Sequence, residues 1–285
     1  MQENHSDLHL RLTEAASAIG GLTGRSHHDM VAVLGSGLGG YPDQIEGAIK
    51  VPYDRIPGFP EPSAPGHSGA AYSVEMGRNR VLLYSGRVHH YEGYSPDQIV
   101  FSIRAAILSG ARCVVLTNAS GGCRSDIAPG DLVLLTDHIN PTGLSPLRGP
   151  NDDRLGTRFP DMTDVYSPWL RQQAREAADQ VGVGLREGVY MWWRGPMFET
   201  PAEIRMAITL GADLIGMSTV PEAIAARHMG AEVLGISLCT NRAAGLAAGR
   251  ITGEEVIEVA GQAAGRLRRL FDALLPRLEA CPPKA

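Results

Sequence analysis

The stretch Met30-Val31-Ala32-Val33-Leu34 is a continuous apolar run that ends at Gly35. Such a run is typical of a parallel β-strand that is buried on both faces. Similar strand-like segments recur along the chain, and helical patterns lie between several of them. The strand-like segments are Arg80–Ser85, Cys113–Asn118, Leu132–Asp137, Gly188–Trp192, Leu214–Met217 and Val233–Leu238, and the helical ones are Leu8–Ile19, 96–109, 167–180, 201–210, 220–229 and about 253–279. This alternation predicts an α/β protein.

The organisation predicted from this alternation is one domain over residues 1–285. It is a mixed, mostly parallel sheet with helices on both faces. Residues 57–69 carry four prolines, which disfavours both a helix and a central strand there. No long linker or shift in composition divides the chain.

Composition limits the possible functions. Hydrophobic residues make up 44% of the 285 residues and charged residues 20%, which is typical of a globular protein. No apolar run approaches the roughly 20 residues that span a bilayer, and the N-terminus does not resemble a signal peptide. We therefore expect a cytoplasmic protein that does not bind membranes.

The net charge of −5 argues against nucleic acid as a partner. The one basic cluster, Arg266-Leu267-Arg268-Arg269, is interpreted as the solvated face of a helix. The four cysteines form no Cys-x-x-Cys pair, so neither a zinc site nor a disulfide framework is predicted.

Polar or glycine-rich segments follow six of the predicted strands. In open α/β sheets, ligands bind beyond the carboxyl ends of the strands, so these segments predict one shared crevice. The segments are Gly35–Gly40, Gly86–Tyr94, Asn118–Gly122, Gly195–Thr200, Gly216–Thr219 and Thr240-Asn241.

The segment Gly86–Tyr94 combines Arg87, His89, His90, Tyr91 and Glu92 between two glycines. Arginine offers a planar fork of donors to an oxyanion, histidine can relay a proton near neutral pH, and tyrosine provides an amphipathic wall. The composition favours a site for an oxyanion beside a flat, partly apolar ligand. A satisfied hydrogen-bond network at a strand end is the alternative.

The glycine loop Gly35-x-Gly37-x-x-Gly40 matches the dinucleotide-binding pattern. A dinucleotide fold also needs a long helix at the third glycine, whereas Tyr41-Pro42 follows here and leaves room only for a short helix. A small anion such as orthophosphate needs only backbone amides and the Ser36 hydroxyl. We therefore favour phosphate over a nicotinamide oxidoreductase, which stays the alternative.

Over nearly the whole chain, these segments and several others resemble the trimeric purine nucleoside phosphorylases. The motifs occur in the family's order. Beyond those quoted above, they are Pro65-Gly66-His67, Asp137–Asn140, Pro146–Asp152 and Val220-Pro221-Glu222.

The resemblance implies phosphorolysis of inosine, guanosine and their 2′-deoxy analogues to a free purine base and α-(deoxy)ribose 1-phosphate. It implies a pentosyltransferase with a distorted, barrel-like sheet, active as a homotrimer. Orthophosphate is then a co-substrate, and no cofactor or metal is expected. A binding or regulatory protein on the same scaffold is a further alternative.

The resemblance also assigns roles to individual residues. The phosphate site comprises Ser36, His67, Arg87, His89, the Ala119 amide and Ser218. The nucleoside site comprises Tyr91, Phe198, Glu199, Met217, Asn241 and, from a neighbouring subunit, Phe159; the catalytic residues are Asn241, Glu199 and His89.

Plainer roles remain for several of these residues. Ser36 or Glu199 could cap a helix, His67 could be a surface histidine, Met217 could be core, and Asn241 could be a turn residue. His138 and Trp192-Trp193 are interpreted as structural.

Gly253 departs from the family, which usually places a histidine there for the sugar 5′-hydroxyl. A phosphorylase for 5′-modified nucleosides such as 5′-methylthioinosine or 5′-methylthioadenosine is therefore the alternative substrate class.

Overall fold

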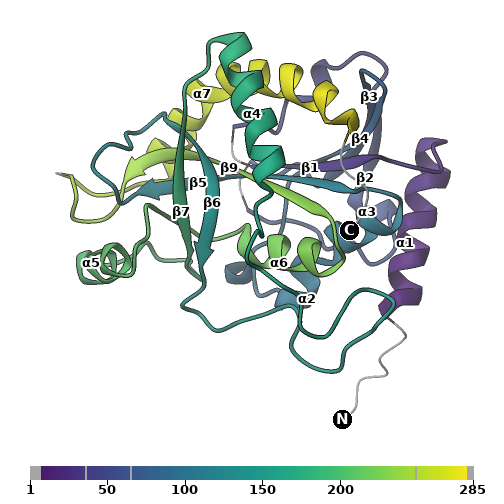
Figure 1. Cartoon of the computed structure of the whole chain (residues 1–285), viewed down its shortest axis with the longest axis horizontal. Helices are drawn as coiled ribbons and strands as arrows, with labels where there is room; N and C mark the ends of the chain where they lie inside the picture. The colour runs from purple at the N-terminus through teal and green to yellow at the C-terminus, as the bar shows by residue number, and fades with distance from the viewer. Residues whose placement is uncertain (1–7, 36, 65, 248, 281–285) are drawn as a thin grey trace.

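The computed structural model describes residues 8–35, 37–64, 66–247 and 249–280, and it alternates strands and helices as predicted (Figure 1). The strands are β1 Met30–Leu34, β2 Ile49–Pro52, β3 Ala70–Met76, β4 Asn79–Ser85, β5 Cys113–Gly122, β6 Leu132–Ile139, β7 Leu185–Trp192, β8 Leu214–Gly216 and β9 Glu232–Arg242. The α-helices are α1 Leu8–Thr23, α2 Pro96–Ile99, α3 Phe101–Leu108, α4 Pro168–Val181, α5 Pro201–Thr209, α6 Val220–His228 and α7 Gly253–Leu274. Short 3-10 helices are η1 Pro42–Gln44, η2 Tyr53–Arg55, η3 His90–Glu92 and η4 Leu275–Ala280.

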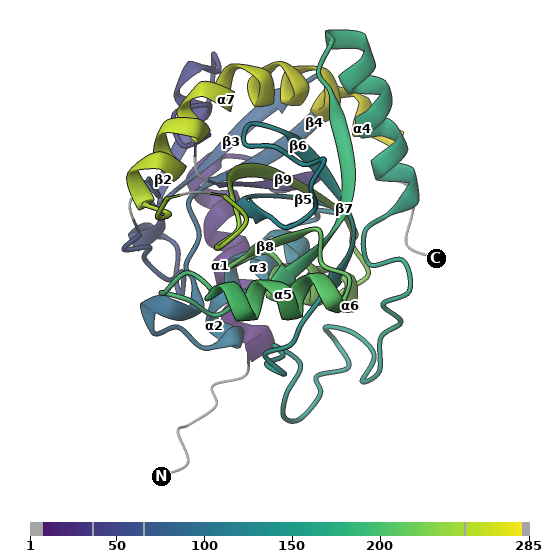
Figure 2. The same cartoon turned by 90° about the vertical axis from the view of Figure 1, so that its left-hand side faces the viewer.

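The sheet is mixed and partly closed into a barrel. Its strand order is β2-β3-β4-β1-β5-β8-β7-β6-β9, and β9 also pairs with β5, so the last five strands form a ring (Figure 2). The parallel pairs are β1–β4, β1–β5, β5–β9, β6–β7 and β7–β8, and the antiparallel pairs are β2–β3, β3–β4, β5–β8 and β6–β9. The predicted fold class, a mostly parallel barrel-like sheet, is confirmed.

Both faces of the central strand β1 are buried, which explains its continuous apolar run. Met30, Ala32 and Leu34 pack in a core with α4 and α7, whereas Val31 and Val33 pack in another with α1, α3 and α6. Figure 1 shows α4 and α7 on one side of the strands and α6 on the other. Helices therefore cover both faces, as the sequence predicted.

Two strands extend further than their apolar runs. β5 continues to Gly122 and β9 to Arg242, and their parallel pairing runs on past a bulge at Ser120/Gly121. The polar residues Asn118, Ser120, Thr240 and Asn241 therefore lie in strands, and both strands end later than the predicted Asn118 and Leu238. Backbone pairing between the two strands does not depend on apolar side chains, which were the only strand signal available.

Other element boundaries differ for local reasons. The segment 96–109 contains two helices because Val100 (φ −93°, ψ 0°) interrupts the helical backbone. The closing helix becomes a 3-10 helix at Leu275, just before Pro276, a residue that cannot donate within an α-helix. The edge strand β2 and its neighbour β3 were not predicted, and Ala70, Ala71 and Ser73 give β3 a weak strand signal.

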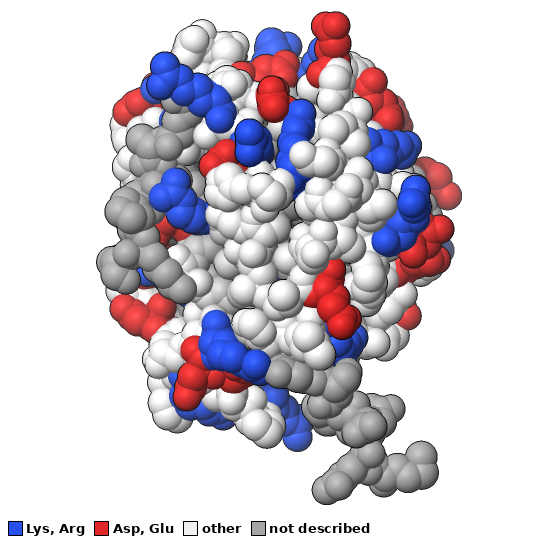
Figure 3. Space-filling view, turned by 90° about the vertical axis from the view of Figure 1, so that its right-hand side faces the viewer, with Lys and Arg blue, Asp and Glu red and all other residues white. Residues whose placement is uncertain are grey.

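The cysteines and surface add three observations. Cys113 is disulfide-bonded, contrary to the expectation from the cysteine spacing, whereas Cys123 and Cys239 are free and buried. None of the helices in the described ranges has the length and apolar character needed to cross a bilayer. On the face in Figure 3, Lys and Arg side chains are interspersed with Asp and Glu.

Candidate functional site

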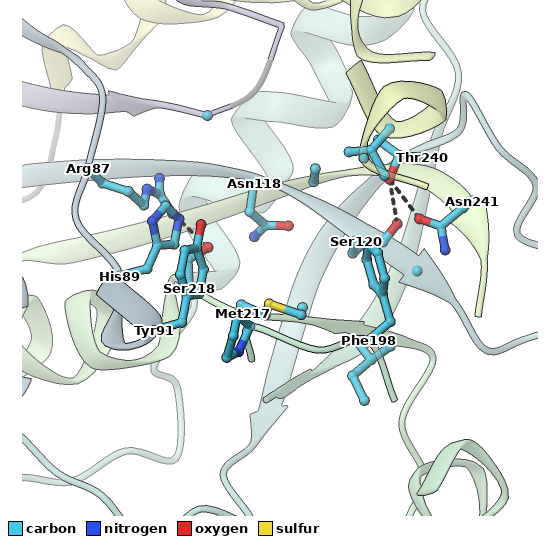
Figure 4. A pocket seen from close by; sticks show the side chains of 18 of the residues that line it. Arg87, His89, Tyr91, Asn118, Ser120, Phe198, Met217, Ser218, Thr240 and Asn241 are labelled. Carbon is cyan, nitrogen blue, oxygen red and sulfur yellow. Dashed lines mark hydrogen bonds between the residues drawn. The ribbon is translucent and has the colours of Figure 1, made fainter. Parts of the chain in front are cut away.

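The carboxyl-terminal ends of the strands surround a pocket of about 340 Å³ (Figure 4). Arg87, His89, Tyr91 and Ser218 gather at one end of it, which we call the anion end. At the other end, which we call the purine end, lie Ser120, Phe198, Thr240 and Asn241. The shared crevice predicted from the six polar segments thus exists.

Arg87 is the buried cation of the anion end. Its Nη1 donates to Ser218 Oγ at 3.0 Å and Thr219 Oγ1 at 3.1 Å, and its Nη2 donates to the Thr117 carbonyl at 2.5 Å. Glu222 Oε2 lies 3.2 Å from Nη1. The Nε atom is buried without a hydrogen-bond partner among the described residues. A buried donor without a partner favours a ligand acceptor.

Two histidines stand beside Arg87. His67 Nδ1 accepts the Arg87 backbone N–H at 3.1 Å, which places the proton of a neutral ring on Nε2. His89 Nδ1 lies 2.7 Å from Glu92 Oε1, and its ring stacks on Tyr91 with centroids 4.7 Å apart. Both histidines line the pocket, whereas the adjacent His90 lines a neighbouring one.

The local environment sets the charge of these groups. Burial lowers the pKa of His67 to about 3, with help from the nearby His89 and Arg87, so this ring is a neutral donor. Burial acts to raise the pKa of Glu92, but hydrogen bonds from His89 and Ser63 outweigh it and lower the value to about 2. Glu92 is therefore an ionised acceptor for His89.

A tight turn after β8 places the hydroxyls of Ser218 and Thr219 beside Arg87. Val220 N–H donates to the Ser218 carbonyl at 2.8 Å, which closes a three-residue turn around Thr219. Met217 lines the pocket, and a Cβ at Gly195 (φ 65°) would collide with its sulfur. The positive φ favours glycine at position 195, and a side chain there would displace Met217.

Gly35 marks a second close approach. Its N–H donates to Thr117 Oγ1 at 2.7 Å, and a Cβ there would lie 2.9 Å from the Thr117 carbonyl oxygen. After this loop comes only η1, a single 3-10 turn, and not the long helix that a dinucleotide site needs. The glycine pattern therefore does not support a nicotinamide oxidoreductase.

Asn241 presents its amide at the purine end. Its Oδ1 accepts from Thr240 Oγ1 at 3.0 Å, and its Nδ2 donates to the Arg242 carbonyl at 3.0 Å. Thr240 Oγ1 also lies 3.3 Å from the Ser120 carbonyl (Figure 4). One amide hydrogen and one oxygen lone pair remain for a ligand.

Glu199 is a buried carboxyl at the same end. Burial raises its pKa, and the charge of Glu203 adds to this, although a backbone hydrogen bond acts in the opposite direction. The α5 helix is capped by Thr200 and Glu203, whose side chain and backbone groups bond reciprocally. Glu199 is therefore not the helix cap that the sequence left as an alternative.

The structure brings most of the predicted site residues together. Those that line the pocket are His67, Arg87, His89, Tyr91, Ala119, Phe198, Glu199, Met217, Ser218 and Asn241. Ser36 lies outside the described residues. Phe159 is 86% exposed and does not line this pocket, so its predicted role in a neighbouring subunit's site stays a prediction.

Other pocket residues were quoted in motifs without a role. Asn118 and Ser120 line the pocket from β5, and Thr240 lines it from β9. Asn118 Nδ2 donates to Thr219 Oγ1 at 2.9 Å, and its Oδ1 accepts from Ser237 at 2.6 Å. Their positions beside named site residues were the only signal available.

The pocket thus holds a buried arginine and two histidines at one end and a carboxyl and a carboxamide at the other. A phosphate-dependent transferase needs a site of this kind. The model of the phosphorylase superfamily matches residues 29–276. The chain belongs to this superfamily and, within it, to the purine nucleoside phosphorylases, which are pentosyltransferases.

Individual relatives support this assignment. Purine nucleoside phosphorylase 1 of Geobacillus stearothermophilus is 47% identical over 85% of this chain and 89% of its own length. Isoform 2 of the Schistosoma mansoni enzyme, solved with cytosine and ribose-1-phosphate, superposes with a TM-score of 0.88 at 36% identity, covering 95% of this chain and 97% of its own. A Schistosoma mansoni structure with inosine gives 0.88 at 35% identity, with 94% and 96% covered.

Proposed function

We propose that this chain, as a single domain over residues 1–285, cleaves inosine, guanosine and their 2′-deoxy analogues with orthophosphate. The products are the free base and α-(deoxy)ribose 1-phosphate. The proposal rests on one observation: the buried Arg87 and the amide of Asn241 line opposite ends of the same pocket. The names of the relatives support purine nucleosides and do not favour 5′-methylthio compounds as the substrate class.

Orthophosphate is proposed to bind at the anion end. The Ser218 hydroxyl, His67 and His89 lie beside Arg87, and the Ala119 amide lines the same pocket. We propose that all four donate to the phosphate oxygens. The ionised Glu92 holds the proton of His89 on Nδ1 or stabilises the charged ring, which leaves Nε2 for the anion. Ser36 is proposed as a further donor.

The nucleoside is proposed to lie with its base at the purine end and its sugar against Tyr91 and Met217. Asn241 bonds the base at N7 and O6, and Glu199 accepts from N1–H. Phe198 packs against the base or sugar. Within a homotrimer, Phe159 of one subunit reaches the sugar pocket of the next.

The reaction exchanges one bond at the anomeric carbon for another. The glycosidic C–N bond breaks, its electron pair moves to the purine, and a phosphate oxygen bonds to the carbon. The phosphate charge opposes the positive charge that develops on the sugar, while Asn241 stabilises the negative charge on the base. Only contacts that strengthen during this change add rate, and one well-aimed donor contributes roughly 3–4 kcal/mol. The proposal requires orthophosphate as co-substrate and no cofactor.

The test is hypoxanthine release from inosine with and without orthophosphate. We expect release that depends on phosphate and yields ribose 1-phosphate in equal amount. Binding of inosine without release would support a binding protein on this scaffold instead. Release without phosphate would indicate hydrolysis and contradict the proposal.

A further inference from the structure

Glu222 is a buried carboxylate next to the anion end that has no part in the roles proposed above. It lies in the first turn of α6, and 3% of its side chain is exposed. Its Oε2 accepts the Thr219 backbone N–H at 3.0 Å and lies 3.2 Å from Arg87 Nη1. One atom, Glu222 Oε2, thus contacts both the Thr219 N–H at the start of α6 and the guanidinium of Arg87.

The residue that Glu222 caps has a strained backbone. Thr219 has φ 73° and ψ −48°, and among the described residues it is the only non-glycine with positive φ. β-Branched residues rarely adopt this conformation, which persists only where surrounding contacts enforce it. The Glu222 carboxylate accepts from the Thr219 N–H, and the Arg87 and Asn118 side chains donate to Thr219 Oγ1. This Oγ1 also lies 3.1 Å from Ser218 Oγ, and the Thr219 carbonyl accepts from the Ala223 N–H at 2.8 Å.

This strained turn determines where the Ser218 hydroxyl lies. Ser218 immediately precedes Thr219, and its Oγ accepts from Arg87 Nη1 at 3.0 Å. Glu222 therefore holds two anion-end groups in one geometry: Arg87 directly, and Ser218 through the turn.

We infer that Glu222 is a positioning residue for the phosphate co-substrate; this inference rests on the proposed function. Its negative charge opposes an incoming anion, so its benefit to phosphate binding is geometric. Because Oε2 alone makes both contacts, the oxygen of a neutral amide can make them as well.

The test compares Glu222→Ala with Glu222→Gln. We expect Glu222→Ala to raise the KM for orthophosphate about tenfold or more, because Arg87 loses its buried charge partner and the Thr219 N–H loses its acceptor. The KM for inosine should change less than about threefold. Glu222→Gln should restore the phosphate KM to within about threefold of the parent value, since it keeps both hydrogen bonds.

Glu203→Ala is the matched control. Glu203 makes the same capping box with Thr200 at the start of α5, away from the anion end. Its loss should lower the melting temperature as any lost cap does, with the phosphate KM within about twofold of the parent value.

Three results would overturn the inference. In the first, Glu222→Ala changes the KM for orthophosphate and the KM for inosine by similar factors. In the second, it changes neither. In the third, Glu222→Gln shows the same phosphate KM as Glu222→Ala. Calorimetric titration with orthophosphate alone measures the same difference without turnover. If the parent chain showed no phosphate-dependent cleavage, the proposed function would fail, whereas the titration would still test Glu222.

Discussion

Arg87, at the anion end of the pocket, is held by Thr117, Ser218, Thr219 and Glu222, whereas Asn241, at the purine end, is held by its two chain neighbours. One residue of the purine end, Phe198, is 41% exposed, whereas Ser120, Thr240 and Glu199 at that end are as buried as Arg87. The purine end also adjoins a second cavity of about 640 Å³ lined by residues of the 242–251 loop.

The comparison shows two ways to recognise a substrate. A small anion needs donors fixed before it arrives, because reorganising buried charges on binding costs free energy. The purine base proposed for the other end offers a large apolar face, which the exposed ring of Phe198 can contact. We therefore expect substitutions at the anion end to change phosphate kinetics selectively, and those at the purine end to change base choice.

The largest effect is expected for Arg87→Ala. Loss of the main counter-charge should raise the KM for phosphate about 100-fold or more, with a change of less than about fivefold for inosine. Initial rates at varied phosphate and fixed inosine measure this. Arg104→Ala removes another buried arginine, one that contacts the Pro146 carbonyl outside the pocket, and is the control. Unchanged phosphate saturation in Arg87→Ala would show that the anion binds elsewhere.

The next effect concerns base choice. The Asn241 amide can donate to a 6-oxo group, so the parent chain should prefer inosine and guanosine to adenosine. Asn241→Asp should shift the ratio of kcat/KM values toward adenosine by about 10- to 100-fold, since an ionised carboxylate only accepts. Kinetics on the three nucleosides test this. Equal constants for inosine and adenosine in the parent would refute the assignment of Asn241.

Glu92→Gln should give a smaller effect, confined to the anion end. The neutral amide still accepts from His89 but no longer stabilises a charged ring, so kcat/KM for phosphate should fall about tenfold. Because the pKa of Glu92 is lowered in the folded state, its stabilisation is present above pH about 4.5 and is lost as the pH falls toward about 2. The stability difference between parent and variant should shrink over the same range. A selective change in inosine KM would contradict the placement of His89.

The smallest effect is expected for Phe159→Ala. Phe159 is exposed in the single chain, so its truncation should leave stability unchanged. Loss of one aromatic contact from a neighbouring subunit should raise the KM for inosine about fivefold. Kinetics together with light scattering test this. A fully active monomer would end the proposal of shared sites.

The sequence alone determined much of this fold. Apolar runs long enough to be buried on both faces predicted the parallel strands β1, β5 and β9, and the 3.6-residue pattern predicted the helices over them. It could not predict β2 and β3, because these strands form by pairing with β4 and with each other and their own composition gives a weak signal.

For the site, the sequence identified the polar segments at the strand ends, since chemistry-bearing residue types are unusual after buried strands. Through the family resemblance it also identified many of the residues that line the pocket, but gave no role to Asn118, Ser120 and Thr240. The sequence could not predict which residues contact the Arg87 side chain, because Thr117, Thr219 and Glu222 lie far from Arg87 along the chain.

Tertiary structure alone decided which contacts hold the side chains at each end of the pocket. Closure of β5 against β9 brings Asn118 and Ser237 together, and the start of α6 brings Glu222 to Arg87. Hydrogen bonds and ion pairs act over about 3 Å, so only residues that folding brings into contact can form them. Motifs thus predicted many of the groups that line the pocket, whereas long-range packing determined which contacts hold each of them.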